Sequence, residues 1–147
     1  MKTLKYFSIL IGITGIIQLV NVTPAGFAQC ASFTRGKCMS KLKPYISTEQ
    51  VHSSTLLTND KTKTSMTFYF GDEYRILICA HKDLGKVEVN LKDKLNNVVF
   101  TTKGYESVVW DFNVENTQDL TLEVITPPGK TGAEEKSGCV SIIVGFK

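Results

Sequence analysis

Residues 108–124 read VVWDFNVENTQDLTLEV, and this stretch decides the fold. Apolar and polar residues alternate along both of its arms, and the polar segment 115–119 separates the arms. Alternation with a period of two is typical of a β-strand that has one face in a core and the other in water. The stretch therefore predicts two successive strands with these core residues: Val108, Trp110, Phe112, Val114, Leu120, Leu122 and Val124.

The same alternation recurs on either side of this stretch. It predicts further strands at 64–70, 74–78, 87–91, 98–100 and 140–146, with another possible strand at 51–57. In the first of these, Phe70 belongs to the core row with Met66 and Phe68, and Tyr69 lies on the opposite face. Seven or eight short strands without a helical pattern between them favour an antiparallel β-sandwich over an α/β fold. We therefore predict an all-β fold, with residues 29–147 as one domain.

The segment 30–45 has a different pattern. Met39, Leu42 and Tyr45 lie near helical spacing, and Pro44 would end a helix there. We expect a short helical or irregular N-terminal cap over one end or face of the sandwich.

Residues 1–28 are predicted to be a secretory signal peptide. Lys2 and Lys5 precede an apolar run at 7–20, and small residues occupy the positions that a signal peptidase inspects, Gly26 and Ala28. The apolar run is shorter than the ~20 residues that span a bilayer, so we expect no stable membrane span. Gln29 stands where a lipoprotein signal has a small residue, which disfavours lipidation at the following cysteine. The predicted location is secreted or periplasmic.

Composition excludes several classes of protein. The 147 residues carry 17 Lys and Arg against 14 Asp and Glu, and 42% of them are hydrophobic. These values are typical of a globular domain and not of a disordered or collagen-like chain. A net charge of +3 lacks the basic excess of a dedicated nucleic-acid binder, so we expect no nucleic-acid partner.

Four cysteines follow the predicted signal peptide: Cys30, Cys38, Cys79 and Cys139. In an exported chain they predict disulfides rather than a metal site, and no Cys-x-x-Cys motif is present. Alternation places Cys79 and Cys139 on the outer face of strands that could be neighbours, while Cys30 and Cys38 are close in sequence. This favours Cys30–Cys38 with Cys79–Cys139. The other pairings, which would tie the cap onto the sheet, stay open.

Motifs that suggest catalysis or metal binding are weak. The Gly129–Thr131 tripeptide ends like a phosphate-binding loop, but it lacks that loop's first glycine and the helix that should follow. His52 and His81 have no zinc-binding motif and no nucleophile signature near them. We therefore expect no catalytic residue, metal or cofactor. The loop 126–138 is long enough to be functional or mobile.

Charge along the chain suggests how the cap is held. No basic residue occurs between Lys103 and Lys130, and Asp111 and Glu123 lie on the wet faces of successive strands. Our hypothesis is that the basic segment 35–43 docks the cap against these acidic residues. The alternative is that the acidic residues form a charged face offered to a partner.

Four segments carry a family resemblance: FYFG (68–71), YRI (74–76), WDF (110–112) and LTLEV (120–124). Their order resembles small secreted bacterial sandwiches of the pre-peptidase C-terminal type and, more distantly, the GOLD domains of p24-like proteins. The resemblance covers 66–147 and implies a jelly-roll-like sandwich that binds or assists rather than catalyses. Segment 86–91 lacks the Asp-x-Asp-Leu-Tyr strand usual in the pre-peptidase type.

The sequence therefore predicts an exported, non-enzymatic binding or accessory module whose partner is a protein or a cell-surface component. The alternatives are a small secreted hydrolase that uses carboxylates and a proteinase inhibitor that acts through loop 126–138. An enzyme should show a pocket with converging carboxylates, an inhibitor should show a protruding ordered loop, and a binding module should show neither of these but a flat apolar or aromatic patch. The candidate interaction residues are Tyr69, Tyr105, Asp111, Glu123 and Lys130.

Overall fold

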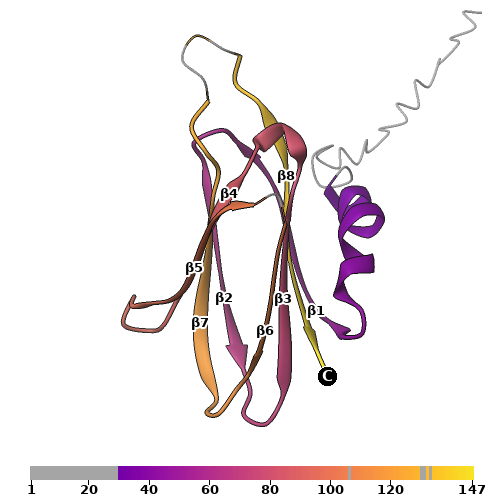
Figure 1. Ribbon diagram of the computed structural model, residues 1–147, viewed down its shortest axis with the longest axis vertical. Helices are drawn as coiled ribbons and strands as arrows, with labels where there is room; N and C mark the ends of the chain where they lie inside the picture. The colour runs from indigo at the N-terminus through magenta and orange to yellow at the C-terminus, as the bar shows by residue number, and fades with distance from the viewer. Residues whose placement is uncertain (1–29, 106, 130–131, 133) are drawn as a thin grey trace, which may run out of the picture.

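The computed structural model of the chain describes residues 30–105, 107–129, 132 and 134–147, without the side chain of Glu49 (Figure 1). The predicted signal peptide at 1–28 and the candidate residue Lys130 lie outside the described residues. Within the described residues, no helix has the length and apolar character needed to cross a membrane.

Eight strands make up most of the described chain. Their bounds are β1 Ile46–Leu57, β2 Lys61–Phe68, β3 Glu73–Ala80, β4 Val87–Lys92, β5 Val98–Tyr105, β6 Ser107–Asn113, β7 Gln118–Ile125 and β8 Ser137–Phe146. Every predicted strand is present, and β1 and β5 are longer than the alternation indicated. One short 3₁₀ turn, η3 (Lys82–Leu84), follows β3.

The strands form two antiparallel sheets with the orders β1-β8-β3-β6 and β2-β7-β4-β5. The pairs β1·β8, β2·β7, β3·β6 and β4·β5 are those of one long hairpin whose two arms have been rolled onto two sheets. This arrangement is the jelly roll. The all-β, jelly-roll-like antiparallel sandwich expected from the sequence is confirmed.

Alternate side chains along the strands form the core between the sheets. In β4, for example, Val87, Val89 and Leu91 are buried, and the polar residues between them are partly exposed. β3 supplies Ile76 and Ile78 to the same core from the other sheet. Burial of each such aliphatic side chain stabilises the fold by about 1.5–3 kcal/mol, so the inward rows hold the two sheets together.

Aromatic stacking closes one side of the sandwich, where the edge strands β5 and β6 face each other. The rings of Phe100 and Trp110 lie 4.3 Å apart at 5° to one another, and Phe112 stacks on Trp110 at 4.4 Å. The opposite side is formed by the other two edge strands, β1 and β2. That second side carries no comparable aromatic stack among the described residues and is more open.

The cap covers the outer face of the β1-β8-β3-β6 sheet (Figure 1). Residues 30–33 are α-helical, and the helix continues as the π-helical η1 (Thr34–Cys38) and the 3₁₀-helical η2 (Met39–Leu42). A second, smaller core lies beneath it, formed by Cys38, Leu42, Tyr45, Leu77, Cys79 and Ile143. β3 and β8 are therefore buried on both faces, which explains why their sequences are apolar almost throughout.

A disulfide joins Cys30 to Cys139, so the favoured pairing is wrong. In the register between β3 and β8, Ser141 and not Cys139 lies opposite Cys79. Cys139 precedes Ser141 by two residues and lies beside Thr55 of β1. The start of the cap lies at that level, and its first described residue bonds to Cys139. Cys38 and Cys79 are buried thiols.

Candidate functional site

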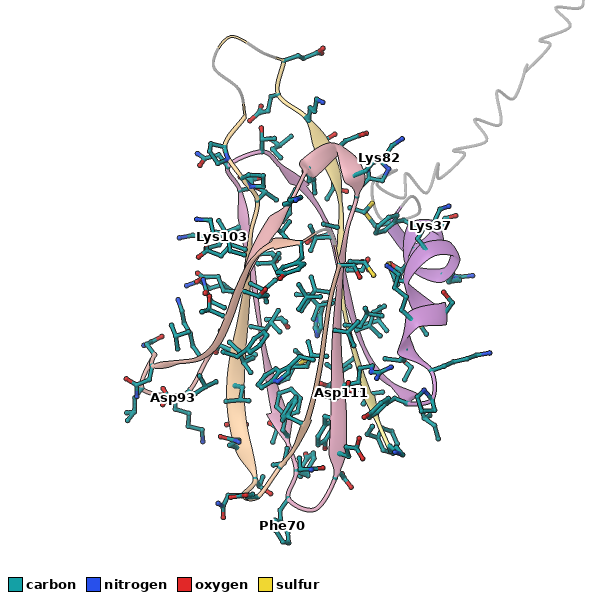
Figure 2. The ribbon with its side chains drawn as sticks, viewed as in Figure 1. Lys37, Phe70, Lys82, Asp93, Lys103 and Asp111 are labelled. Atoms are coloured by element: carbon teal, nitrogen blue, oxygen red, sulfur yellow. A yellow bond between two sulfur atoms is a disulfide. The ribbon has the colours of Figure 1, made fainter. Side chains whose placement is uncertain are left out.

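The most prominent exposed aromatic residues lie at the turn between β2 and β3. β2 ends at Phe68, and the next two side chains, Tyr69 and Phe70, are 60% and 70% exposed. Figure 2 shows Phe70 projecting beyond the end of the sandwich. The prediction that Phe70 faces the core is wrong, because the strand ends two residues earlier than the alternation suggested. We call residues 69–72 the tip loop.

The backbone of the tip loop is fastened to its surroundings. The N–H of Tyr69 donates to the Tyr74 hydroxyl at 3.2 Å, and the N–H of Phe70 donates to Oγ1 of Thr117 at 3.0 Å. Tyr74 itself is buried and packs edge-on against Phe68 at 5.0 Å, and burial raises the pKa of its phenol. The loop is thus hydrogen-bonded directly to a core residue.

A reciprocal pair of hydrogen bonds joins the tip loop to the β6–β7 connection. The N–H of Gly71 donates to the carbonyl of Val114 at 3.1 Å, and the N–H of Val114 donates to the carbonyl of Asp72 at 3.2 Å. Gly71 has a φ of +90°, in the region that favours glycine. The two aromatic side chains therefore stand on an ordered, protruding turn.

Carboxylates surround this turn. Asp72 and Glu115 form no ion pair with any described residue, whereas nearby Glu73 and Asp119 pair with lysines. The Tyr74 hydroxyl donates to Asp72 at 3.2 Å, and Glu115 is exposed. The end of the sandwich that carries the tip loop is therefore aromatic at its centre and acidic at its rim.

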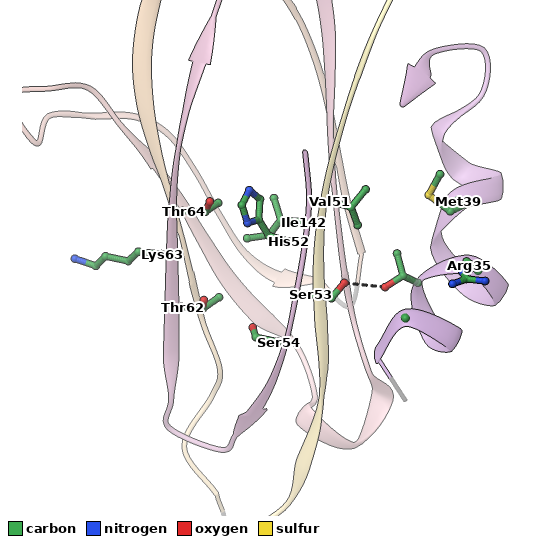
Figure 3. A pocket seen from close by; sticks show the side chains of 12 residues that line it. Arg35, Met39, Val51, His52, Ser53, Ser54, Thr62, Lys63, Thr64 and Ile142 are labelled. Atoms are coloured by element: carbon green, nitrogen blue, oxygen red, sulfur yellow. Dashed lines mark hydrogen bonds between the residues drawn. The ribbon is translucent and has the colours of Figure 1, made fainter. Parts of the chain in front are cut away.

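A pocket with a volume of about 650 Å³ lies on the open side between β1 and β2 (Figure 3). Thr62 and Thr64 point towards His52 and Ser54, while Lys63 points to the opposite side. The described residues that line it include no Asp, Glu or Cys. Its described lining residues therefore hold no carboxylate pair.

Hydroxyl groups hold the cap to the sheet at one edge of this pocket. Thr34, which is buried, donates to the carbonyl of Cys30 at 2.7 Å and contacts Oγ of Ser141 at 2.6 Å and Oγ of Ser53 at 2.9 Å. These hydroxyls bond to one another and to the backbone rather than to a histidine or a carboxylate. Their role is structural.

The two histidines lie apart. His52 lines the pocket, and His81 precedes η3, where its Nδ1 accepts the backbone N–H of Asp83 at 3.4 Å. Among the described residues, no group of three or more His, Cys, Asp and Glu side chains is placed to hold a metal.

Four of the five candidate interaction residues lie within the described residues, and the structure does not bring them together. Tyr69 is on the tip loop, whereas Tyr105, 56% exposed, is at the far end of β5. Asp111 is on β6 in the cap-covered sheet, and Glu123 is on β7 in the other sheet. These four residues therefore do not form one surface.

The hypothesis that the cap docks against both acidic residues is wrong for Glu123. Its carboxylate is buried in the outer face of the second sheet, where Lys92 donates to it at 2.7 Å and Lys63 lies 3.1 Å away. The hydrogen bond from Lys92 lowers the pKa of Glu123. Two strands of its own sheet satisfy this charge, and none is left for the cap.

Asp111 is connected to the cap through Arg75 rather than through a cap lysine. The Arg75 guanidinium donates to both carboxylate oxygens of Asp111, at 2.7 and 2.6 Å, and to the carbonyl of Lys43 at 2.7 Å. It also lies 4.4 Å from the centroid of the Tyr45 ring. Tyr45 donates to Glu73, and this hydrogen bond raises the pKa of Tyr45 to about 12.

The ends of the loop 126–138 are anchored to the β1–β2 turn. Oγ1 of Thr126 contacts the carbonyls of Leu57 and Asp60, and the N–H of Asn59 donates to the carbonyl of Pro127. Residues 130, 131 and 133 of this loop lie outside the described residues. The prediction of a functional loop here stays a prediction.

Comparison with known proteins does not assign this chain to a family. No family model and no curated protein matches the chain. A solved structure of the periplasmic inhibitor of g-type lysozyme from Aeromonas hydrophila, PliG, is similar over 71% of this chain and 90% of its own, with 11% identity and a TM-score of 0.48.

Two carbohydrate-binding modules are also among the similar solved structures. One is the CBM36-1 domain of a xylanase from the hindgut metagenome of Trinervitermes trinervoides, with 13% identity, 72% and 92% coverage and a TM-score of 0.35. The other is a CBM36 module in complex with calcium and xylotriose, with 11% identity, 72% and 96% coverage and a TM-score of 0.35. None of the three is a pre-peptidase C-terminal or GOLD domain, so that resemblance stays a prediction. At these identities and TM-scores, the function of these proteins does not transfer to this chain.

Proposed function

We propose that this protein is an exported, non-enzymatic binding protein whose tip loop inserts into an apolar cleft of a basic partner protein. The observation that supports this most strongly is the pair of large aromatic side chains, Tyr69 and Phe70, exposed on a turn that is held by hydrogen bonds. This is the protruding, ordered feature expected of a protein that blocks or occupies a cleft.

The exposed area of these two rings suits a binding anchor. An aromatic side chain buries about 150–250 Å² when it is enclosed, and the residues that dominate protein interfaces are enriched in aromatic types. Phe70 has no hydroxyl to offer to water, so its exposure carries a cost that a partner could remove. The hydrogen bonds of the tip loop fix its shape before binding and so reduce the entropy lost in the complex.

The acidic rim specifies the kind of partner. Asp72 and Glu115 form no ion pair with a described residue, so their carboxylates are available to pair with a basic surface. Complementary rim charges accelerate association and make it sensitive to salt more than they add affinity. We therefore expect the affinity to depend mainly on the aromatic pair and the association rate to depend mainly on the carboxylates.

A sugar-binding platform fits the structure less well. The outer face of the β2-β7-β4-β5 sheet is uncovered, but its central described residues are charged or hydroxylated and bonded to one another. Examples are Lys92 with Glu123 and Ser65 with Thr121. The described residues of that face include no exposed aromatic ring at its centre on which a sugar could stack, and the exposed aromatic residues that the structure describes lie at the ends of strands instead.

Capture experiments with three proteins test the proposal. The wild type, a Tyr69→Ala/Phe70→Ala variant and a Tyr105→Ala variant are immobilised and exposed to extracellular or periplasmic protein. Tyr105 is the matched control, because it is an exposed tyrosine at the other end of the sandwich. We expect the wild type and the control to retain the same basic protein and the tip variant to lose it.

A purified probe makes the same test quantitative. The g-type lysozyme is one such probe, and a serine proteinase tests the alternative of a proteinase inhibitor in the same format. Capture of the same proteins by the tip variant and the wild type would refute the proposal. Capture that does not weaken as salt rises would refute the role of the acidic rim.

A further inference from the structure

The two cysteines outside the disulfide lie against each other beneath the cap. Cys38, the last residue of η1, is fully buried, and Cys79 of β3 is 4% exposed. Both belong to the small core under the cap, where η1 packs against β3. Two buried thiols on elements that pack against each other are candidates for an S–S bond of about 2 Å.

We propose that Cys38 and Cys79 are a redox-active pair that closes into a second disulfide, with Cys79 as the attacking thiol and Cys38 as the resolving thiol. The first disulfide fastens the start of the cap to β8. The second would fasten the end of η1 to β3. The cap would then be covalently bound to two neighbouring strands of one sheet.

Cys79 is the more accessible of the two thiols. It lines a pocket of about 360 Å³ together with Lys37 and Lys41 of the cap and Lys82 of η3. Figure 2 shows Lys37 and Lys82 at the same end of the molecule, one on the cap and one after β3. Cys38 does not line this pocket.

The surroundings of Cys79 favour its thiolate, which is the reactive form. Hydrogen bonding from the Cys38 thiol lowers the pKa of Cys79, and the Lys41 ammonium and a hydrogen bond from Ser107 act in the same direction. Lys41 is held in place by its own hydrogen bond to Ser107, at 3.1 Å. The interaction with Cys79 and burial raise the pKa of Cys38.

With a glutathione disulfide as oxidant, the reaction balances in two steps. The Cys79 thiolate attacks one sulfur of the oxidant, forms a mixed disulfide and releases one glutathione thiolate, which takes up the proton that Cys79 lost. The Cys38 thiol then loses its proton and attacks Sγ of Cys79, which releases the second glutathione as a thiol. Two protein thiols lose two electrons and two protons, and the oxidant becomes two glutathione molecules.

Peptide mapping tests the bond directly. The protein, expressed from its full coding sequence, is incubated with glutathione disulfide, denatured, treated with iodoacetamide and digested with trypsin without reduction. We expect peptide CMSK (38–41) cross-linked to ILICAHK (76–82), and no iodoacetamide on either peptide. Iodoacetamide on both peptides, or a cross-link from Cys38 to Cys30, would overturn the proposal.

Single substitutions test the order of attack. Cys38→Ser keeps a hydrogen-bond donor beside Cys79 and removes the resolving thiol, so glutathione should accumulate on Cys79. Cys79→Ser leaves only the enclosed Cys38, which should react about tenfold more slowly or less. Equal rates in the two variants would refute the assigned order. Because the mapping experiment uses the wild type, a variant that fails to fold would not affect the test of the disulfide itself.

Discussion

The substitution Gly145→Ala should weaken the docking of the cap. A Cβ atom on Gly145 of β8 would meet Cδ1 of Leu42 at 2.9 Å, Cβ of Tyr45 at 2.9 Å and the carbonyl oxygen of Ile46 at 3.1 Å. The last two atoms belong to the backbone or lie next to it, so they cannot turn away as the end of a long side chain could. The segment that leaves the cap must therefore move outwards.

The expected cost follows from the closeness of these contacts. Adding a methyl group to a well-packed site destabilises a protein by about 1–3 kcal/mol, and two of the three contacts are shorter than Cβ atoms tolerate. Gly36 is the matched control, because it lies within the helical cap and a Cβ atom there would meet nothing within 4 Å. Gly36→Ala should leave stability unchanged or raise it by about 0.5–1 kcal/mol.

Urea denaturation of the oxidised protein measures both variants. We expect a lower midpoint for Gly145→Ala, an unchanged or higher midpoint for Gly36→Ala, and the same slope for both. A Gly145→Ala protein as stable as the wild type would refute the close packing of the cap against β8.

Three further changes probe the interactions that hold the cap and the sheets. Cys139→Ser should lower the free energy of unfolding by about 2–5 kcal/mol in urea titrations, because the Cys30–Cys139 bond closes a loop with a sequence separation of 109. The hydrogen bond from Lys92 lowers the pKa of Glu123 in the folded state. The ionised Glu123 therefore stabilises the fold fully above its ordinary pKa of 4.5, and this stabilisation is lost as the pH falls through the pKa of the folded state. Glu123→Gln should therefore flatten the acid side of a plot of melting temperature against pH, and Glu135→Gln, at an exposed loop position, should not. Arg75→Lys should cost about 1 kcal/mol in thermal melts because lysine cannot bond both oxygens of Asp111, and equal melting temperatures would contradict this role.

Strand positions could be predicted from the sequence because burial of one face leaves a period of two in the chain. That period is clear in 108–124, where β6 and β7 each present one face to the core. It is weaker in β3 and β8, where the cap covers the second face and apolar residues follow one another. The jelly-roll order itself depends on long-range pairing that no local pattern records.

The alternation of residues could not predict the cysteine pairing or the exposure of Phe70, and the reasons differ. Pairing depends on register, and a shift of two residues along β8 separates Cys139 from the position opposite Cys79. Phe70 continues the alternation of Met66 and Phe68, but β2 ends before it. The adjacent Gly71-Asp72 turn was the one local sign that the strand stops there.

Part of the candidate surface was recognisable from the sequence. Tyr69 was identified as solvent-facing, and it is exposed on the tip loop. The stretch between Lys103 and Lys130, which has acidic residues but no basic ones, was also visible in the sequence. The structure distributes the described acidic residues of this stretch over both sheets. Among the described ones, Glu115 joins Asp72 at the rim of the tip loop as a carboxylate without an ion pair, because the β6–β7 connection lies beside the loop.

The most direct test of the central claim is the dissociation constant of the captured basic partner for the wild type and for Phe70→Ala. Loss of a buried aromatic anchor costs about 2 kcal/mol or more, so the constant should rise at least about 30-fold. Because Phe70 is 70% exposed, the same change should leave the free energy of unfolding within about 0.5 kcal/mol of the wild type. Equal dissociation constants for the two proteins would contradict the claim that the tip loop is the binding site.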